Sequence, residues 1–193
     1  WVEKAEQNGW VVPKARFAIF PAQSDGDEVI VCDPENREKE LARIRFDTCI
    51  GKGRKDIFSV AQYFHPVDSG QWDAIGLQIT TAGTGVESGI EEFKAQNDSE
   101  SALYLQGLSD RVAEDLAEYI HQLMRHGIGT KKENRGQRYS PGYPAITGLA
   151  YNRVIWELLG ADDIGVTLTS ANEFHPPSTT AAVVCFHKDA GYS

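Results

Sequence analysis

The chain has 193 residues, of which 41% are hydrophobic, and a formal net charge of -9 at pH 7. This length and composition fit one compact domain and leave little room for a second. The acidic balance opposes nucleic-acid binding, which depends on an excess of Lys and Arg. No apolar run approaches the roughly 18 to 20 residues that cross a bilayer, and the start lacks a signal-peptide pattern. Because the cysteines also show neither disulfide nor metal-knuckle spacing, we expect a cytoplasmic protein with no nucleic-acid or membrane partner.

The chain up to Thr80 is dominated by strand signals. A short helix in residues 1–9 is expected to end at Gly9. The strand candidates that follow are rich in β-branched and aromatic residues and are bounded by turn residues: Arg16–Ala22, Val29–Asp33, Leu41–Phe46, Phe58–Phe64 and Ala74–Thr80. The first two are expected to form a hairpin. Because these strands arrive without intervening helices, we predict a largely antiparallel sheet, with the later helices covering one face or end of it.

The second half of the chain opens with a long helix, capped by Asp98 and running to about Arg125. Its apolar residues recur every three or four positions and predict a core-facing stripe: Leu108, Val112, Leu116, Ile120 and Leu123. The opposite stripe carries Asp110, Glu114, Glu118 and His121. A second helix is expected over Leu149–Leu159, and closing strands over Val166–Thr169 and Thr180–Phe186.

Several familiar site patterns are absent from the sequence. The glycines of Thr81–Gly89 are spaced GxGxxxG rather than GxGxxG, and no second strand ending in an acidic residue follows, so a flexible connection is favoured over a dinucleotide site. The stretch GKGRKD (51–56) is interpreted as a solvated turn. The histidines show no metal-ligand spacing, and no serine lies in a GxSxG elbow. We therefore assign no metal ligand and no catalytic residue.

Asp110 and Glu114 form an i, i+4 pair within the long helix. This spacing places both carboxylates on one helical face, where they could hold a cation or exchange a proton. A solvated acidic face is the alternative interpretation. The spacing alone leaves both open.

The stretch RYSPGYPAI begins at Arg138 and contains a predicted type II turn. Pro141 fixes the first central residue of this turn, and Gly142 supplies positive φ at the second. Tyr143 is then held extended by the proline that follows it. Such a rigid segment could offer backbone donors and acceptors to a planar heterocycle, and Arg138 could form a two-pronged pair with a ligand carboxylate. A stiff structural turn beside an exposed arginine is the alternative.

Taken together, these segments resemble the AdoMet-binding activation domain of cobalamin-dependent methionine synthase. The resemblance is carried by RYSPGYPA and by the order and spacing of four further segments, and it covers nearly the whole chain: 17–33, 91–98, 110–125 and 156–169. It implies an α+β fold with a twisted, mainly antiparallel sheet against which a long helix and shorter helices pack. It also implies that residues 1–193 form a single domain of a longer chain, without the upstream segment that supplies an acidic residue to AdoMet. A chain that starts at Trp1 and has its only methionine at Met124 fits this expectation.

The resemblance implies a function in repair. The domain would present S-adenosylmethionine (AdoMet) so that its methyl group restores cobalamin, which a neighbouring domain of the same protein holds and a flavodoxin-type donor reduces. It would be a methyltransferase module that is not active alone. By position, Arg138 and the backbone of Pro141, Gly142 and Tyr143 would bind AdoMet. Two further groups of residues are implied to face the ligand: the carboxylates Asp110 and Glu114, and the ring of Tyr192. A basic patch at Lys131, Lys132 and Arg135 would meet the electron donor.

The sequence departs from the usual family pattern at several points. Ile146-Thr147 follows the PGYPA stretch in place of Cys-Pro, Ser193 replaces a tyrosine, and His175–Thr180 replaces a Trp-Pro-Gly-Ala-Ser segment. Two other hypotheses therefore stay open. One is a degenerate relative that serves as a non-catalytic binding or scaffold module, and the other is an NAD-dependent enzyme that uses the imperfect glycine run.

Overall fold

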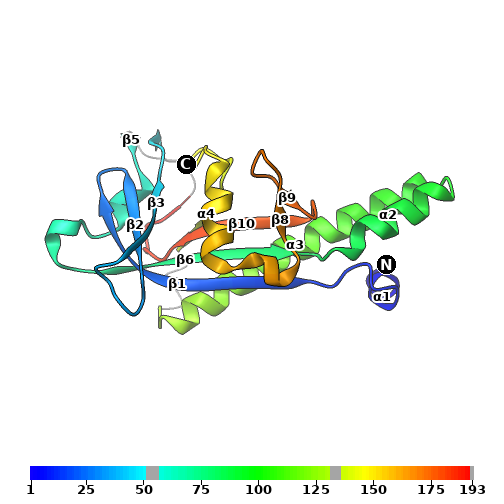
Figure 1. The fold of residues 1–193 in the computed structure, drawn as a ribbon, viewed down its shortest axis with the longest axis horizontal. Coiled ribbons are helices and arrows are strands. Elements are labelled where there is room, and N and C mark those ends of the chain that lie inside the picture. Colours follow the sequence, from blue (N-terminus) through cyan, green and yellow to red (C-terminus); the bar gives the residue numbers. More distant parts are fainter. Residues whose placement is uncertain (51–56, 131–135, 192–193) are drawn as a thin grey trace.

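A computed structural model describes residues 1–50, 57–130 and 136–191 (Figure 1). Helices and strands follow one another in this order: α1 (Val2–Gln7), β1 (Lys14–Asp25), β2 (Glu28–Cys32), β3 (Glu40–Arg45), β4 (Cys49–Ile50), β5 (Ile57–Phe58), β6 (Asp73–Thr81), α2 (Gly85–Ala95), α3 (Ser99–Gly127), β7 (Gln137–Tyr139), α4 (Ala150–Leu159), β8 (Thr167–Leu168), β9 (Phe174–His175) and β10 (Thr179–Cys185). None of the helices in these described ranges combines the length and the hydrophobicity that a membrane span needs.

The central sheet confirms the predicted α+β class. Over the described ranges it has six strands in the order β3-β2-β1-β6-β10-β7, and each neighbouring pair is antiparallel. Figure 1 shows its twist: β2 and β3 stand steeply against the long strands β1, β6 and β10. The hairpin of β1 and β2 confirms the predicted pairing across the turn before Glu28. The β3-β2-β1 part follows the chain through short connections, as antiparallel neighbours allow, whereas β6, β10 and β7 join the sheet across longer connections that carry other elements.

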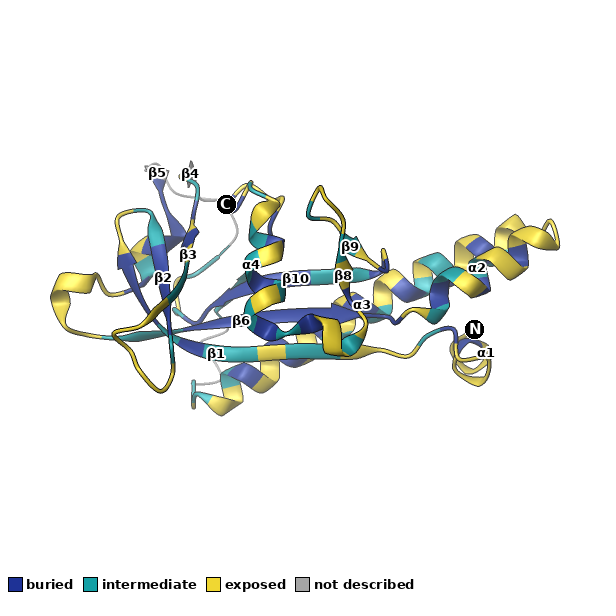
Figure 2. Ribbon diagram, in the orientation of Figure 1, coloured by how far each residue is buried: buried dark blue, intermediate teal, exposed yellow. Residues whose placement is uncertain are grey.

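Helices cover both faces of the sheet, so the expectation that they cover one face or end is wrong. Strand β6 is buried along most of its length (Figure 2). Its side chains alternate between the faces: Leu77 joins the main core with Ile155 of α4, whereas Gln78 and Thr80 contact α3. A central strand buried on both sides requires a helix layer on each.

Helix α3 has the predicted start and ends at Gly127, close to the predicted end at about Arg125, but its core-facing stripe differs from the prediction. The Asp98 side chain caps it by accepting a hydrogen bond from the Ser101 N–H at 3.0 Å. The buried residues are mostly small: Ala102, Leu105, Ser109, Ala113, Ala117, Ile120, His121 and Met124. Of the five predicted core residues, Ile120 alone is buried, Leu123 is exposed, and the other three are half-buried.

Hydrogen bonds between α3 and β6 explain this difference. The Gln78 amide donates to the Ala117 carbonyl at 3.1 Å, and the Thr80 hydroxyl donates to the Ala113 carbonyl at 2.9 Å. A helix whose carbonyl groups lie within reach of strand side chains has room only for small residues at the contact. The bulky residues of the predicted stripe are therefore displaced to its flank.

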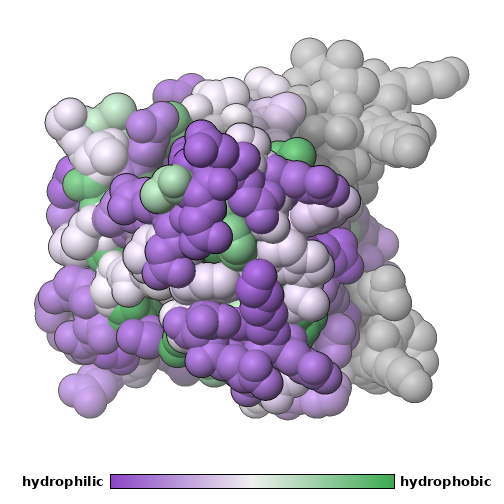
Figure 3. Space-filling model, turned by 90° about the vertical axis from the view of Figure 1, so that its right-hand side faces the viewer, coloured by the Kyte–Doolittle hydropathy of each residue, from purple (hydrophilic) through white to green (hydrophobic). Residues whose placement is uncertain are grey.

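Of the predicted flexible connection Thr81–Gly89, the part from Gly85 onward is instead the start of a helix. Gly85 to Ala95 form α2, which packs along the first part of α3 and projects from the sheet (Figure 1). A Cβ atom at Gly89 would lie only 2.7 Å from Leu105 Cδ2 and from Trp10 Cγ, so this glycine permits close packing. The end of the molecule near α1 and α2 presents a mainly hydrophilic surface with scattered hydrophobic residues (Figure 3).

Two predicted strands are confirmed only in part. Of Phe58–Phe64, Phe58 ends strand β5 and Val60–Tyr63 form a short 3-10 helix. The Ser59 hydroxyl causes the change, since it accepts from the Ala61 N–H and donates to the Phe46 carbonyl. Of Val166–Thr169, Thr167–Leu168 pair with β9 outside the central sheet. The predicted turn at 51–56 lies outside the described residues.

Candidate functional site: a pocket between α3 and the edge of β10

Strand β10 has a partly open edge. On the side away from β6, β7 pairs with Val183, Val184 and Cys185. Over the part of the chain that the structure describes, no strand pairs with Thr179 to Ala182 on that side. A depression of about 160 Å³ lies here, and we call it the α3–β10 pocket. Its lining combines carboxylates, hydroxyls and small residues: Asp110, Ala113, Glu114, Pro177, Ser178, Thr179 and Thr180.

The predicted carboxylate pair therefore lines one pocket. Asp110 Oδ1 accepts hydrogen bonds from Ser178 Oγ and from Gln106 Nε2, both at 2.8 Å. Glu114 lies one turn further along α3 and is exposed. Within the described ranges, its carboxylate has neither a hydrogen-bond donor nor a cation as a partner. Asp110 is thus held in place, whereas no cation among the described residues compensates the charge of Glu114.

Arg138 lies on β7, at the same edge of the sheet. It pairs with Val184 in the register of β7 and β10, and its side chain is 22% exposed. The guanidinium NH2 lies 3.6 Å from Glu118 Oε2, one turn beyond Glu114 on α3. His121, which the sequence placed on the polar stripe, is buried beneath this pair, with Nδ1 3.9 Å from the same oxygen. The Arg138 side chain therefore meets the acidic stripe of α3, while its backbone belongs to the edge strand β7.

The predicted type II turn follows β7. Gly142 has a φ of 89°, and the Tyr143 N–H donates to the Ser140 carbonyl at 3.3 Å, which confirms the turn. The expectation that the turn leaves its backbone donors open is wrong at two positions. The Tyr143 N–H is used in the turn, and the Gly142 N–H donates to the Ile146 carbonyl at 2.8 Å. The first is the turn's own i to i+3 bond, and the second forms because the chain folds back so that Ile146, which is fully buried, lies beside Gly142.

What the turn exposes is acceptors and an aromatic ring. Among the described residues, no donor bonds to the carbonyl groups of Pro141 and Gly142. The Tyr143 side chain is 60% exposed. The turn does not line the α3–β10 pocket itself, but it continues from the strand that carries Arg138. The arrangement can offer a polar ligand carboxylates, one guanidinium, main-chain acceptors and a ring.

Comparison with known proteins agrees with these features. A family model described as "Vitamin B12 dependent methionine synthase, activation domain" matches residues 1–193. The chain belongs to this activation-domain family. It is 26% identical over 216 residues to the methionine synthase of Mycobacterium tuberculosis (strain ATCC 25618 / H37Rv), in a match that covers all of this chain and 18% of that protein.

A solved structure has the same fold as this activation domain. A crystal structure of the MetH reactivation domain bound to AdoHcy superposes with a TM-score of 0.89 at 25% identity, and the match covers 100% of this chain and 64% of that chain. The family resemblance predicted from the sequence is thereby confirmed. The chain spans less than two thirds of the length of either relative.

A brace that the sequence did not reveal fixes the turn of the activation domain. Asp47, just after β3, accepts hydrogen bonds at Oδ2 from the Thr147 N–H at 2.8 Å and from the Thr147 hydroxyl at 2.7 Å. The Asp47 N–H donates to the Ala145 carbonyl at 2.9 Å. The Thr147 N–H and, next, its hydroxyl hold the pKa of the Asp47 carboxyl below its usual range. Thr147 is one of the residues at which the sequence leaves the family pattern, and here it has a defined structural role.

Some predicted residues cannot be placed at the site. Tyr192, expected beside the ligand, lies outside the described residues, and so do Lys131, Lys132 and Arg135 of the expected basic patch. The segment His175–Thr180, at which the sequence departs from the family, contributes one wall of the α3–β10 pocket through Pro177 to Thr180.

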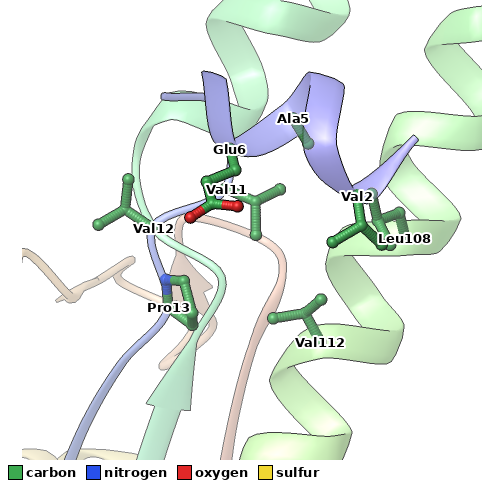
Figure 4. Close-up of a pocket in the computed structure, with 8 residues that line it drawn as sticks. All are labelled: Val2, Ala5, Glu6, Val11, Val12, Pro13, Leu108 and Val112. Atoms are coloured by element: carbon green, nitrogen blue, oxygen red, sulfur yellow. The ribbon is translucent and has the colours of Figure 1, made fainter. Parts of the chain in front are cut away.

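A second, larger depression of this activation domain lies on the other flank of α3. It measures about 380 Å³ and is lined mainly by aliphatic side chains from α1, residues 11–13 and α3 (Figure 4): Val2, Ala5, Glu6, Val11, Val12, Pro13, Leu108 and Val112. Leu108 and Val112 belong to the predicted core stripe, and Figure 4 shows them extending from α3 toward α1 and residues 11–13. Glu6 is the single charged group among these lining residues. This groove therefore lacks the convergent polar groups of a site for a charged ligand.

Proposed function

We propose that this activation domain binds AdoMet along the edge of β10 and presents it for the methylation of cobalamin held by another domain of the same protein. The observation that chiefly supports the proposal is the combination of a carboxylate and a guanidinium at one sheet edge in a member of this family. The carboxylate, Glu114, has no cationic partner in the described part of the chain, and the guanidinium is that of Arg138. AdoMet carries a sulfonium cation and an α-carboxylate. The sulfonium is opposite in charge to Glu114, and the α-carboxylate is opposite in charge to Arg138.

Each residue of the edge has a distinct part in this proposal. Glu114 faces the sulfonium, Arg138 binds the α-carboxylate, and Asp110 accepts a hydrogen bond from a donor group of the ligand. The carbonyl groups of Pro141 and Gly142 and the ring of Tyr143 border the adenosine part, with Tyr192 as a further aromatic neighbour. The residues of this chain bind and orient the ligand, and none acts as a nucleophile or a general base.

The chemistry comes from the ligand and its acceptor. Methyl transfer breaks the S–CH₃ bond, leaves the bonding electron pair on sulfur and gives the neutral thioether S-adenosylhomocysteine (AdoHcy). The methyl group goes to reduced cobalamin, for which a flavodoxin-type donor supplies the electron. The domain is then a module of a cytoplasmic methyltransferase that makes methionine, and it needs its neighbouring domain to act.

A binding measurement on the full-length protein tests the proposal. Isothermal titration with AdoMet is compared between the wild type, Arg138→Ala and a control, Arg111→Ala, whose guanidinium lies on the exposed side of α3 and pairs with Asp115. Loss of a charge-assisted pair with a carboxylate is expected to weaken AdoMet binding by about 10- to 100-fold. The control is expected to bind as the wild type does. NAD, titrated in parallel, is expected not to bind.

Two observations favour a second function, a binding or scaffold module with no AdoMet. Arg138 already has an anionic neighbour in Glu118, and two N–H groups of the turn are bonded internally. A full-length wild-type protein that fails to bind AdoMet would support this alternative and refute the proposal above.

A further inference from the structure

The side chains of Gln106, Asp110 and Ser178 form a closed hydrogen-bonded triangle at the wall of the α3–β10 pocket. We propose that Ser178 and Gln106 are positioning residues: they fix the Asp110 carboxylate so that its free oxygen meets a hydrogen-bond donor of the ligand. This inference rests on the proposed function and deepens it, because it names what orients one of the ligand-facing groups.

The hydrogen-bond directions in the triangle follow from its chemistry. The Ser178 hydroxyl donates its single proton to Asp110 Oδ1 at 2.8 Å. The Gln106 amide donates to the same Oδ1 at 2.8 Å and to Ser178 Oγ at 3.1 Å, which uses both of its protons. Each donor of the triangle is thus committed. Both donors to the carboxylate act on one oxygen, and in the described part of the chain none acts on Oδ2.

Ser178 is a rigid anchor for this arrangement. Its side chain is almost completely buried, with 3% of the residue exposed. Its own carbonyl accepts a hydrogen bond from the Ala82 N–H at 2.9 Å, at the end of the central strand β6. Asp110, in contrast, lies on an exposed helical face, where an aspartate without partners moves among several rotamers. The hydroxyl therefore transfers the rigidity of the sheet to a carboxylate on the helix.

The consequence is a division of work between two carboxylates that are one helical turn apart. Glu114 has no fixed partner among the described residues and can act through its charge alone. Asp110 has one oxygen occupied by hydrogen bonds and the other held at the pocket wall, so it can act as an acceptor of fixed orientation. A donor group of the ligand, such as an ammonium, an amine or a hydroxyl, then meets an acceptor that is already oriented.

The alternative role of the triangle is structural, namely to dock the segment before β10 onto α3. A thermodynamic cycle separates the two roles. AdoMet and AdoHcy affinities are measured by isothermal titration on the full-length protein for the wild type, Ser178→Ala, Asp110→Ala and the double variant. The positioning role predicts that Ser178→Ala weakens both ligands by about three- to ten-fold. In the Asp110→Ala background the same change is expected to weaken the affinity for each ligand by less than about two-fold.

Two further variants keep the test decisive. Gln106→Ala removes the other donor at a partly exposed position and is expected to weaken both ligands in the same direction, even where Ser178→Ala folds poorly. Ser88→Ala removes an exposed hydroxyl that bonds to the Gly85 carbonyl on α2, and it is expected to leave both affinities unchanged.

The outcomes distinguish this inference from the proposed function. Wild-type affinity in Ser178→Ala and Gln106→Ala, or an equal loss in the presence and absence of Asp110, would overturn the positioning role and leave AdoMet binding intact. A wild-type protein that binds neither ligand would refute the proposed function together with this inference.

Discussion

Replacement of Glu114 by glutamine tests the electrostatic part of the site. The change keeps the shape of the side chain and removes one negative charge. Because Glu114 is exposed and has no hydrogen-bond or ion-pair partner among the described residues, the free energy of unfolding is expected to change by less than about 0.5 kcal/mol. Any effect on ligand binding is then not a secondary effect of misfolding.

The expected loss of affinity follows from Coulomb's law. A carboxylate about 5 Å from a sulfonium gains roughly 0.8 kcal/mol in water and about 3 kcal/mol at the effective dielectric of a protein surface. The α3–β10 pocket is shallow, about 160 Å³ in volume, and Glu114 is open to solvent, so the lower end applies. We expect about 1 kcal/mol, which corresponds to roughly five-fold weaker AdoMet binding.

The assay compares two ligands that differ in this charge. AdoHcy carries a neutral thioether in place of the sulfonium, so Glu114→Gln is expected to weaken AdoHcy by less than about two-fold. The difference between the ligands is expected to shrink as salt is raised, because exposed charges are screened. Asp115→Asn serves as the control, since it removes a carboxylate on the same helix that pairs with Arg111 at 2.8 Å. Equal losses for the two ligands, or no loss for AdoMet, would refute the electrostatic role.

Three predictions concern stability, each measured by urea unfolding. Asp47→Ala is expected to lower the free energy of unfolding by about 1 to 2 kcal/mol at pH 7. Because Thr147 lowers the pKa of Asp47 in the folded state, this contribution is present above the ordinary carboxyl pKa of about 4 and is lost as pH falls through the folded pKa. A difference in stability between wild type and variant that stayed constant down to pH 2 would contradict this. Gly142→Ala is expected to cost about 1 kcal/mol or more, since φ is 89° there, and an unchanged midpoint would contradict the strained turn. Gly89→Ala gains about 1 kcal/mol of helix propensity but puts Cβ 2.7 Å from Trp10 Cγ. Because overpacking is expected to cost about 1 to 3 kcal/mol, we expect the variant to be less stable and the near-UV signal of Trp10 to change. A stabilised variant would show that the contact relaxes freely.

The parts of the fold that the sequence predicted are those set by local chemistry. The Asp98 cap, the β1–β2 hairpin and the turn at Gly142 each depend on residues a few positions apart. Such signals act through backbone preferences and nearby hydrogen bonds, which tertiary packing did not override here. The order and spacing of these segments then carried the family resemblance, which implied the α+β fold.

The core-facing stripe of α3 could not be predicted in this way. Hydrophobic periodicity assigns a helical face to the largest apolar residues, and it therefore selected the stripe of Leu108 and Val112. The contact with β6 is set instead by Ala113 and Ala117, whose carbonyls accept from strand side chains. Small residues carry little hydropathy signal, so the distance between two backbones is not visible in the pattern.

The supports of the site were invisible for a different reason. Ser178 and Asp110 are 68 positions apart in the sequence, and Thr147 and Asp47 are 100 apart. A serine before a strand and a threonine after a turn are common, and neither pattern indicates a distant carboxylate. Both supports became apparent only when the fold brought the segments together.

These long-range supports explain how one short strand can form a site. Because β7 ends at Tyr139, the first half of β10 has no strand neighbour in the described chain on the side away from β6. An open edge by itself would favour pairing with another chain. Here the edge is bordered by the carboxylates of α3 on one side and by a turn braced by Asp47 on the other. The same interruption of the sheet therefore exposes the main-chain edge of β10 and surrounds it with fixed polar groups. A ligand that satisfies both would be held by a helix, a strand edge and a braced turn, and such fixed supports favour a defined orientation of the ligand.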